Sequence, residues 1–331
     1  MSGRSVAVAG ATGAVGAEML KVLEKREFPV SRMKLLASSR SVGKELEFAG
    51  EKIAVEELKT DSFKGVEIAL FSAGGDRSKE FAPAAVADGC VVVDNSSHFR
   101  LDEGVPLVVP EINPEAVKSH NGIIANPNCS TIIADVAVWP LHKAATVKRI
   151  VCATYQATSG AGAKGMAELE EQASAIERGE EAKVEFFAHQ IAFNLIPSIG
   201  GWAGNGYSTE EMKLLNETRK IFGDDSIRVS CTTVRVPVYR AHSEAINLEL
   251  ASPLSVEEAR ELIREAPGVE LVDDAENEVY PMPLDATGRD DVLVGRIRKD
   301  ESVENGLDMW VSGDQLLKGA ALNAVQIAEL L

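Results

Sequence analysis

The chain has 331 residues, which at about 100–200 residues per domain predicts two domains, and 45% apolar side chains suffice for a core in each. Its 34 basic and 51 acidic side chains give a formal charge of −17, which argues against nucleic acid or an anionic membrane as a partner. Because neither a charged-then-apolar leader nor an apolar run long enough to cross a membrane is found, we expect a cytoplasmic protein.

Apolar segments alternate with amphipathic segments through the first third of the chain. This rhythm predicts an α/β domain, a doubly wound parallel sheet of the Rossmann type with helices on both faces. The expected strands are 5–10, 33–37, 66–72, 91–94 and 122–125, and the expected crossover helices are 15–25 and 78–87.

Three glycines, Gly10, Gly13 and Gly16, lie where the first strand is expected to turn into a helix. Backbone N–H groups and the helix dipole at such a turn can bind a pyrophosphate. The spacing is GxxGxxG and not the usual GxGxxG, and a tight turn can need glycine for steric reasons alone. The position directly after the first strand favours the dinucleotide interpretation.

The second expected strand ends in a polar cluster that includes Ser38, Arg40 and Ser41. An NAD-binding domain usually has Asp or Glu here to bind the ribose 2′-hydroxyl. Hydroxyls and a guanidinium suit a 2′-phosphate instead, so the sequence predicts NADP. The alternative is a solvated polar turn without a ligand.

After residue 140 the strands become longer and more alternating, at 149–158, 227–238 and 245–250, with a helix expected at 163–178. This pattern predicts an α+β second domain with a mixed, partly antiparallel sheet. The closing segment 314–331 reads as a helix that packs back onto the first domain. We therefore predict a cofactor domain of residues 1–128 with 314–331, and a second domain of residues 129–313.

The four cysteines are too few and too scattered for a disulfide scaffold, and no two have metal-ligand spacing, so no metal is expected. Cys90, Cys152 and Cys231 lie in or beside strand-like runs, where a thiol usually fills the core. Cys129 instead follows strand 122–125 and begins a helical run. The helix dipole there lowers a thiol pKa, so Cys129 is the predicted nucleophile, with buried filler as the alternative.

A thiolate that attacks an aldehyde needs a partner to take the hydroxyl proton of the thiohemiacetal as hydride leaves. His242 follows an alternating strand at 234–239 and is the best placed of the five histidines. By spacing alone the other four could serve. They are His98, His120, His142 and His189.

Several motifs together resemble the aspartate-β-semialdehyde dehydrogenase family along essentially the whole chain. They are the glycine turn 10–16, the polar cluster 37–41, Asp94-Asn-Ser-Ser-His-Phe-Arg100, Asn126-Pro-Asn-Cys-Ser-Thr131, Tyr155-Gln-Ala-Thr-Ser-Gly-Ala-Gly162, and Arg235-Val-Pro-Val with His242 seven residues later. The resemblance implies a fold similar to glyceraldehyde-3-phosphate dehydrogenase, in which the second domain also forms the interface of a homodimer, with a homotetramer as the larger alternative.

The resemblance also implies the chemistry of the site. Cys129 forms the acyl-enzyme, His242 is the acid/base and Gln156 orients the thioacyl group. Inorganic phosphate then releases L-4-aspartyl phosphate, and the biosynthetic direction reduces that compound to L-aspartate 4-semialdehyde. This reaction belongs to the aspartate pathway, which leads to lysine and diaminopimelate, methionine, threonine and isoleucine.

Binding roles follow from the same resemblance. Arg235 binds the substrate carboxylate, Glu210 the substrate ammonium, and Arg100 with Lys213 the phosphate. The implied cofactor contacts are Gly10, Thr12, Gly13, Ala14, Val15, Ser38, Arg40, Ser41, Ser159, Gly160 and Gln315. Members of the family often have Asn in place of Gln315, which makes its nicotinamide contact the least secure of these.

Two alternatives stay open. N-acetyl-γ-glutamyl-phosphate reductase has the same domain plan and thioester chemistry, but its cysteine motif typically has Gly before the cysteine and Tyr-Pro after it. Here Asn128 precedes Cys129, and Ser130 and Thr131 follow. The second alternative is a catalytically inactive relative that keeps the dinucleotide domain as a binding module.

Overall fold

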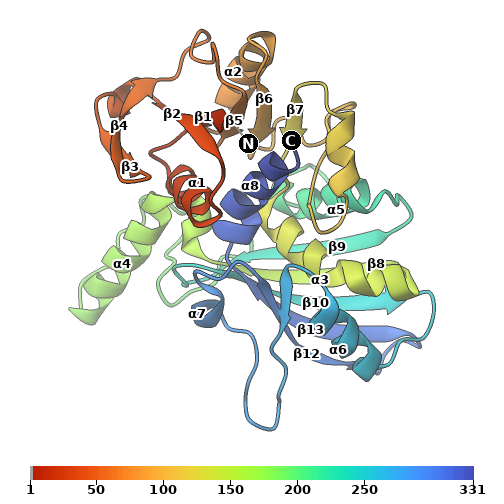
Figure 1. The fold of residues 1–331 in the computed structure, drawn as a ribbon. Coiled ribbons are helices and arrows are strands. Elements are labelled where there is room, and N and C mark those ends of the chain that lie inside the picture. Colours follow the sequence, from red (N-terminus) through yellow and green to blue (C-terminus); the bar gives the residue numbers. More distant parts are fainter. Residues whose placement is uncertain (1–2) are drawn as a thin grey trace. The chain divides into compact units, whose positions relative to one another are not determined.

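A computed structural model describes residues 3–331 of the chain. The chain forms two compact units, one of residues up to 128 together with 320–331, and one of residues 129–319 (Figure 1). Within residues 3–331, no helix combines the length and the apolar character that a membrane crossing requires.

The first unit is built on a seven-stranded sheet in the order β3-β4-β2-β1-β5-β6-β7. All neighbours pair in parallel except the edge pair β3 and β4. The strands are β1 (Arg4–Ala9), β2 (Val30–Ala37), β3 (Glu45–Phe48), β4 (Glu51–Glu57), β5 (Ile68–Phe71), β6 (Val91–Asp94) and β7 (Ile123–Ala125). The helices are α1 (Ala14–Lys25), α2 (Gly75–Ala87) and α8 (Leu322–Glu329), with short 3₁₀ turns η1 (Ser39–Ser41) and η2 (Pro114–Ser119).

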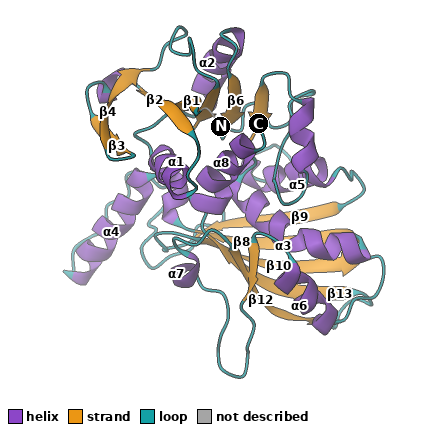
Figure 2. Ribbon diagram, in the orientation of Figure 1, coloured by secondary structure: helices purple, strands orange, loops and turns teal. Residues whose placement is uncertain are grey.

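The second unit is built on a six-stranded mixed sheet in the order β11-β12-β13-β10-β8-β9. Its strands are β8 (Val147–Gln156), β9 (Arg228–Arg235), β10 (His242–Leu250), β11 (Val269–Leu271), β12 (Val292–Asp300) and β13 (Gly306–Gly313). Its helices are α3 (Cys129–Ala145), α4 (Ala163–Glu177), α5 (Thr209–Phe222), α6 (Val256–Glu265) and α7 (Pro283–Ala286), with a 3₁₀ turn η3 (Thr158–Ala161). Figure 2 distinguishes these strands from α3, α5 and α6, which pack against the sheet.

The structure confirms the fold class. Each strand expected in the first unit is present within a few residues, and the second sheet is partly antiparallel as predicted. The hairpin of β3 and β4 and the strands β11, β12 and β13 were not predicted.

The closing segment corrects one prediction. Residues 314–331 are not a single helix, and residues 314–319 belong to the second unit. A π-helical turn, η4 (Leu317–Ala321), precedes α8. The physical reason is that the buried side chains of Asp314 and Gln315 bond to residues of the second unit, whereas Asn323 in α8 bonds to the Val108 carbonyl of the first.

A cluster of buried acids lies between α3 and the second sheet. Asp135 on α3 accepts a hydrogen bond from Thr218 Oγ1 at 2.8 Å, and its Oδ2 has no hydrogen-bond partner. Burial, together with the charge of Glu217, raises the pKa of Asp135 well above its usual range, against the opposing bond from Thr218. Burial raises the pKa of Glu244 in the same direction. Burial therefore favours the neutral forms of Asp135 and Glu244.

Asp135→Asn tests this protonation. The pKa of Asp135 is higher in the folded than in the unfolded protein. Its protonated carboxyl group therefore contributes fully to the free energy of unfolding below the unfolded pKa of about 4, and this contribution declines as pH rises toward the folded pKa. The variant keeps the acceptor for Thr218 and loses the titration. Urea unfolding at pH 5.5 and pH 8 should show that the variant loses less stability with rising pH than the parent, by roughly 1–3 kcal/mol. Equal losses, with the exposed Asp225→Asn as the control, would contradict the assignment.

Candidate active site

Cys129 and His242 meet at the end of the second sheet. Cys129 is the first residue of α3, as predicted, and His242 is the first residue of β10. The Sγ of Cys129 lies 3.6 Å from Nε2 of His242, and the other ring nitrogen, Nδ1, accepts the backbone N–H of Ala157 at 3.1 Å. A half-buried thiol beside a fully buried imidazole is an arrangement suited to nucleophilic catalysis.

The pKa of the His242 ring is lowered to about 3. Burial is the largest cause, and the nearby charge of Arg235 acts in the same direction, while Glu210 opposes both. The imidazole is therefore neutral in the folded protein at ordinary pH.

Gln156 and Arg235 end two neighbouring strands in register. Gln156 closes β8 and Arg235 closes β9, and the two are partners in the parallel ladder. The Gln156 amide donates to Ser130 Oγ at 2.6 Å, which ties the end of β8 to the first turn of α3. The Arg235 guanidinium donates to the Ala157 carbonyl at 2.6 Å. Burial lowers the pKa of Arg235, and the charges of Cys129 and Glu210 oppose that shift.

Glu210 and Lys213 lie one turn apart on α5. The helix begins with a capping box in which Ser208 and Glu211 bond to each other's backbone, so its first turn is fixed. Lys213 donates to Glu210 at 2.8 Å. Glu210 is close enough to influence the pKa of both His242 and Arg235, so the structure gathers Cys129 and these three charged or titratable residues at one place.

The first unit contains the glycine turn. A Cβ on Gly10 would lie 2.3 Å from the Ser72 carbonyl oxygen, and one on Gly16 would lie 2.2 Å from the Gly10 oxygen, so both positions require glycine. Helix α1 starts at Ala14 with no side-chain cap and no acidic residue in its first turn. Its first N–H groups therefore suit a phosphate ligand, which fits the predicted dinucleotide.

The polar cluster after β2 lies next to this turn. Ser41 Oγ is 3.3 Å from Thr12 Oγ1, so the two predicted halves of the cofactor site are in contact. Arg40 lies exposed in the 3₁₀ turn η1, and within residues 3–331 no carboxylate forms an ion pair with it. An exposed guanidinium beside two hydroxyls is compatible with a 2′-phosphate.

Arg100, also in the first unit, is buried against the backbone. Its guanidinium donates to the carbonyls of Asn126 and Asn95 at 2.9 and 3.0 Å. The Asn126 side chain is in turn fixed by Asn95 and by Asn323 of α8, both at 2.7 Å. Arg100 and Lys213 belong to different units, so the phosphate site that they are expected to share stays a prediction.

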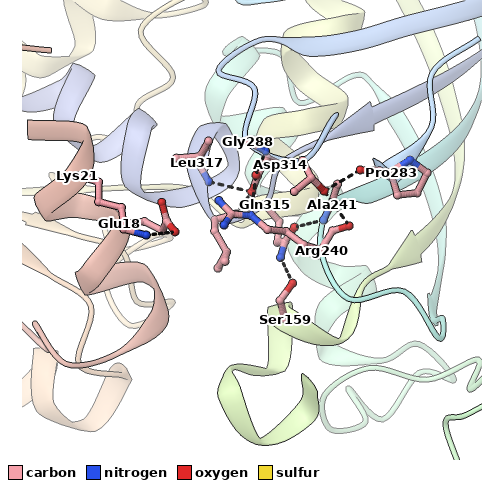
Figure 3. A network of polar contacts seen from close by, with 12 residues as sticks. Glu18, Lys21, Ser159, Arg240, Ala241, Pro283, Gly288, Asp314, Gln315 and Leu317 are labelled. Atoms are coloured by element: carbon pink, nitrogen blue, oxygen red, sulfur yellow. Dashed lines mark hydrogen bonds and ion pairs between the residues drawn. The ribbon is translucent and has the colours of Figure 1, made fainter. Parts of the chain in front are cut away.

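Gln315 is part of a polar network, shown in Figure 3. Its carbonyl accepts the N–H of Ala241 at 2.8 Å and its amide donates to Ser159. The preceding residue, Asp314, is fully buried and accepts from Arg240 Nε at 2.8 Å and the Gly288 N–H at 2.7 Å (Figure 3). Both ends of the Gln315 amide are thus bonded to the protein, and its predicted nicotinamide contact is not tested.

Gly160 lies close to two side chains of the site. A Cβ there would lie 3.1 Å from both Arg235 Nη1 and His242 Cε1. The turn that contains Ser159 and Gly160 therefore packs directly against the catalytic candidates.

The other three cysteines are buried, in agreement with their prediction as core residues. Burial raises the pKa of Cys90 to about 12. The pKa of Cys152 is also raised, first by its hydrogen bond with Cys231 and then by burial. In residues 3–331, no group of three histidine, cysteine or acidic side chains could hold a metal ion.

Three contributors were missed by the sequence analysis. They are the backbone of Ala157, the hydroxyl of Ser130 and the pair of Arg240 with Asp314. Ser130 could have been found, because it follows the cysteine within the same motif. The role of the Ala157 backbone could not be predicted, because backbone groups are the same in almost every residue type. The ion pair could not be predicted either, because its two residues are 74 positions apart and form no local sequence pattern.

Two family models match the chain. The model described as semialdehyde dehydrogenase, NAD binding domain, matches residues 5–120, and the model described as semialdehyde dehydrogenase, dimerisation domain, matches residues 138–318. With the fold described above, these matches define a two-domain semialdehyde dehydrogenase, a class of oxidoreductase.

Curated relatives are more specific. Aspartate-semialdehyde dehydrogenase from Synechocystis is 56% identical over 98% of this chain and 96% of its own length, and the same enzyme from Aquifex aeolicus is 56% identical over 99% and 98%. The chain therefore belongs to the aspartate-semialdehyde dehydrogenase family, which confirms the resemblance predicted from its motifs.

Solved structures agree. A crystal structure of aspartate semialdehyde dehydrogenase II from Vibrio cholerae, complexed with ASA, has a TM-score of 0.98 and 48% identity and covers 100% of this chain and 98% of that one. Aspartate semialdehyde dehydrogenase with NADP from Candida albicans has a TM-score of 0.78 and 27% identity, with 100% and 98% covered.

Gln315→Leu tests the role of the network in Figure 3. The buried N–H of Ala241 then loses its acceptor, which costs roughly 1–3 kcal/mol, so we expect a lower melting temperature and slower alkylation of Cys129 in cofactor-free protein. Ser159→Ala is the matched control, because it removes only one of the two bonds and should have the smaller effect. If Gln315 served the nicotinamide alone, only cofactor affinity would change.

Proposed function

We propose that the protein catalyses the reversible, NADP-dependent reductive dephosphorylation of L-4-aspartyl phosphate to L-aspartate 4-semialdehyde through a thioester on Cys129. The observation that carries this proposal is the 3.6 Å approach of Cys129 Sγ, at the start of α3, to Nε2 of His242. The ASA complex of the Vibrio cholerae neighbour supports the same substrate.

In the oxidative direction the Cys129 sulfur bonds to the aldehyde carbon, and the adduct oxygen interacts with His242. A bound NADP⁺ supplies the hydride acceptor. Gln156, fixed by Ser130, orients the resulting thioacyl group. Phosphate then attacks the thioester carbon, and the sulfur leaves with the electron pair of the C–S bond. Sulfur suits both steps, because a thiolate attacks well at neutral pH and also leaves well.

Four charged side chains are proposed to bind the substrates. Arg235 binds the carboxylate with its planar guanidinium, and burial makes that interaction stronger than it would be in water. Glu210 binds the ammonium, and Lys213 with Arg100 binds the phosphate. The Lys213 side chain stays partly exposed while it is bonded to Glu210, which favours an exchange of this partner for phosphate.

The cofactor contacts are those of the glycine turn and the polar cluster. Helix α1 offers uncapped N–H groups to the pyrophosphate, at Ala14 and Val15, and Arg40 with the hydroxyls of Ser38 and Ser41 binds the 2′-phosphate. The NADP named with the Candida albicans structure supports this choice. Ser159, Gly160 and Gln315 are the remaining proposed cofactor contacts.

A homodimer, with a homotetramer as the larger alternative, is the proposed assembly, and the dimerisation-domain match supports it. One face of the second sheet is a candidate for the interface. On that face, opposite Cys152, the β8 residues Val151 and Tyr155 are only half-buried. Tyr155 also packs on Trp310, with ring centroids 5.2 Å apart. We also propose that the reaction is part of the aspartate pathway and takes place in the cytoplasm.

Cys129→Ala should abolish phosphate-dependent NADP⁺ reduction by aspartate semialdehyde while NADPH binding, followed by fluorescence, is retained. The reason is that the variant lacks the atom that forms the thioester. Cys90→Ala, which alters a buried thiol of the first unit, is the control and should remain active. Substantial turnover by Cys129→Ala would contradict the covalent route.

The same assay separates the alternatives. Reduction of N-acetyl-γ-glutamyl phosphate in preference to aspartyl phosphate would identify the rival reductase. A Cys129 that iodoacetamide does not label, together with no turnover of either compound, would identify an inactive binding module.

Arg40→Asp should reverse the preference for NADP over NAD, measured as the ratio of kcat/KM for the two cofactors. A carboxylate at this exposed position repels a 2′-phosphate and can accept a bond from a ribose 2′-hydroxyl. The matched control is Arg32→Asp, an exposed arginine on the same strand-and-turn segment but outside the proposed site. An unchanged ratio in Arg40→Asp would mean that the 2′-phosphate is bound elsewhere.

A further inference from the structure

The side chain of Asp94 bonds to two neighbouring segments of the first unit. Asp94 is the last residue of β6, and it is fully buried. Its Oδ1 accepts the hydroxyl of Ser78 at 2.7 Å and the backbone N–H of Ser96 at 3.0 Å. Its Oδ2 accepts the hydroxyl of Ser96 at 2.6 Å. An ionised carboxylate only accepts hydrogen bonds, so three donors suit it in a buried position.

The two serines belong to different segments at one edge of the first sheet. Ser78 lies in the first turn of α2, which follows β5, and Ser96 lies in the turn 95–99, which follows β6. A Cβ built on Gly75, the first residue of α2, would lie 3.9 Å from Cβ of His98, so the start of the helix packs against this turn. Asp94 therefore connects helix and turn at the carboxyl ends of two neighbouring strands, where doubly wound sheets bind their ligands.

Two carbonyl groups that orient Arg100 are held by the same residue. Arg100 Nη2 donates at 3.0 Å to the carbonyl of Asn95, the first residue of the turn 95–99. Arg100 Nε donates at 2.9 Å to the carbonyl of Asn126, and the N–H of Asn126 donates in turn to the Asp94 carbonyl at 2.8 Å. The Asn126 amide also donates to the Asn95 side chain at 2.7 Å. Asp94 therefore fixes both acceptors, the first through its side-chain bonds to Ser96 and the second through its backbone.

We propose that Asp94 is a positioning residue for phosphate binding, because it fixes the direction of the Arg100 guanidinium through Ser96 and Asn126. A planar guanidinium binds phosphate best through two parallel N–H bonds, and this geometry is lost when the plane is turned. Asp94 itself does not touch the phosphate in this proposal. The inference rests on the proposed function, since the phosphate role of Arg100 is part of that function.

Ser96→Ala tests this role in the phosphate-dependent reduction of NADP⁺ by aspartate semialdehyde. The variant keeps the backbone N–H bond to Asp94 and loses the hydroxyl, which bonds both Asp94 and the N–H of His98. We expect KM for inorganic phosphate to rise about tenfold, while kcat and KM for NADP⁺ change by less than about threefold. An unchanged KM for phosphate in the folded variant would overturn the proposal.

Two other serines separate positioning from a general loss of stability. Ser78→Ala removes a buried bond to the same carboxylate but leaves both bonds between Asp94 and Ser96 in place. It should lower the melting temperature as Ser96→Ala does, yet raise KM for phosphate by less than about threefold. Ser302→Ala removes the same kind of hydroxyl bond at the end of β12, to Asp300 at 2.7 Å, and should leave KM for phosphate unchanged. Equal rises of this KM in Ser78→Ala and Ser96→Ala would mean that lost stability is the cause, which would overturn the proposal.

Asp94→Asn tests the carboxylate itself. The amide oxygen still accepts from Ser78 and from the N–H of Ser96, but the amide nitrogen cannot accept the Ser96 hydroxyl. We expect KM for phosphate to rise as in Ser96→Ala, and if Asp94→Asn does not fold, Ser96→Ala decides. A parent protein without phosphate-dependent turnover would overturn the proposed function and this role with it. An active parent whose KM for phosphate is the same in both variants would overturn only the role of Asp94.

Discussion

The bond from the Ala157 N–H to the imidazole of His242 is the contact on which the candidate active site depends. A buried imidazole must have partners for both nitrogens, and here one partner is backbone and the other is the sulfur of Cys129. Because backbone cannot change its bonding with residue type, it sets the ring orientation more rigidly than a side chain would. The Ala157 carbonyl positions Arg235 from the same residue. The positions of the imidazole and of the guanidinium are thus set together by the residue that follows β8.

A second group of contacts holds the backbone just before His242. Ala241, immediately before His242, has φ of +70°, a left-handed conformation that costs a residue with a Cβ about 1–2 kcal/mol. The bond from its N–H to Gln315, and the ion pair of Arg240 with buried Asp314, offset this strain. These contacts explain why the segment before η4 belongs with the second unit although the helix that follows it belongs with the first.

What the sequence predicted follows from local signals. The nucleophile and the glycine turn were found because each lies at a junction of strand and helix, where residue type and position are read together. Strands β12 and β13 were missed because their main support is pairing with each other and with β10, and Gly295 interrupts the apolar pattern of β12. Gln315 was assigned a cofactor contact from the family resemblance, but its partners Ala241 and Ser159 are 74 and 156 residues away. Long-range partners of this kind have no periodicity to detect.

Burial and charge in the site impose one further constraint. The proposed substrate carries a carboxylate, so a cation at position 235 is needed, and burial makes its interaction strong. The same cation, close to the ring of His242, disfavours an imidazolium and so lowers the pKa of that histidine. A buried arginine that binds an anion therefore favours a neutral imidazole beside it before the substrate binds. Glu210 opposes the shift of the pKa at both residues but does not reverse it, so the pKa of His242 stays low before any substrate binds. Burial thus strengthens the proposed binding of a carboxylate at Arg235 and also lowers the pKa of His242.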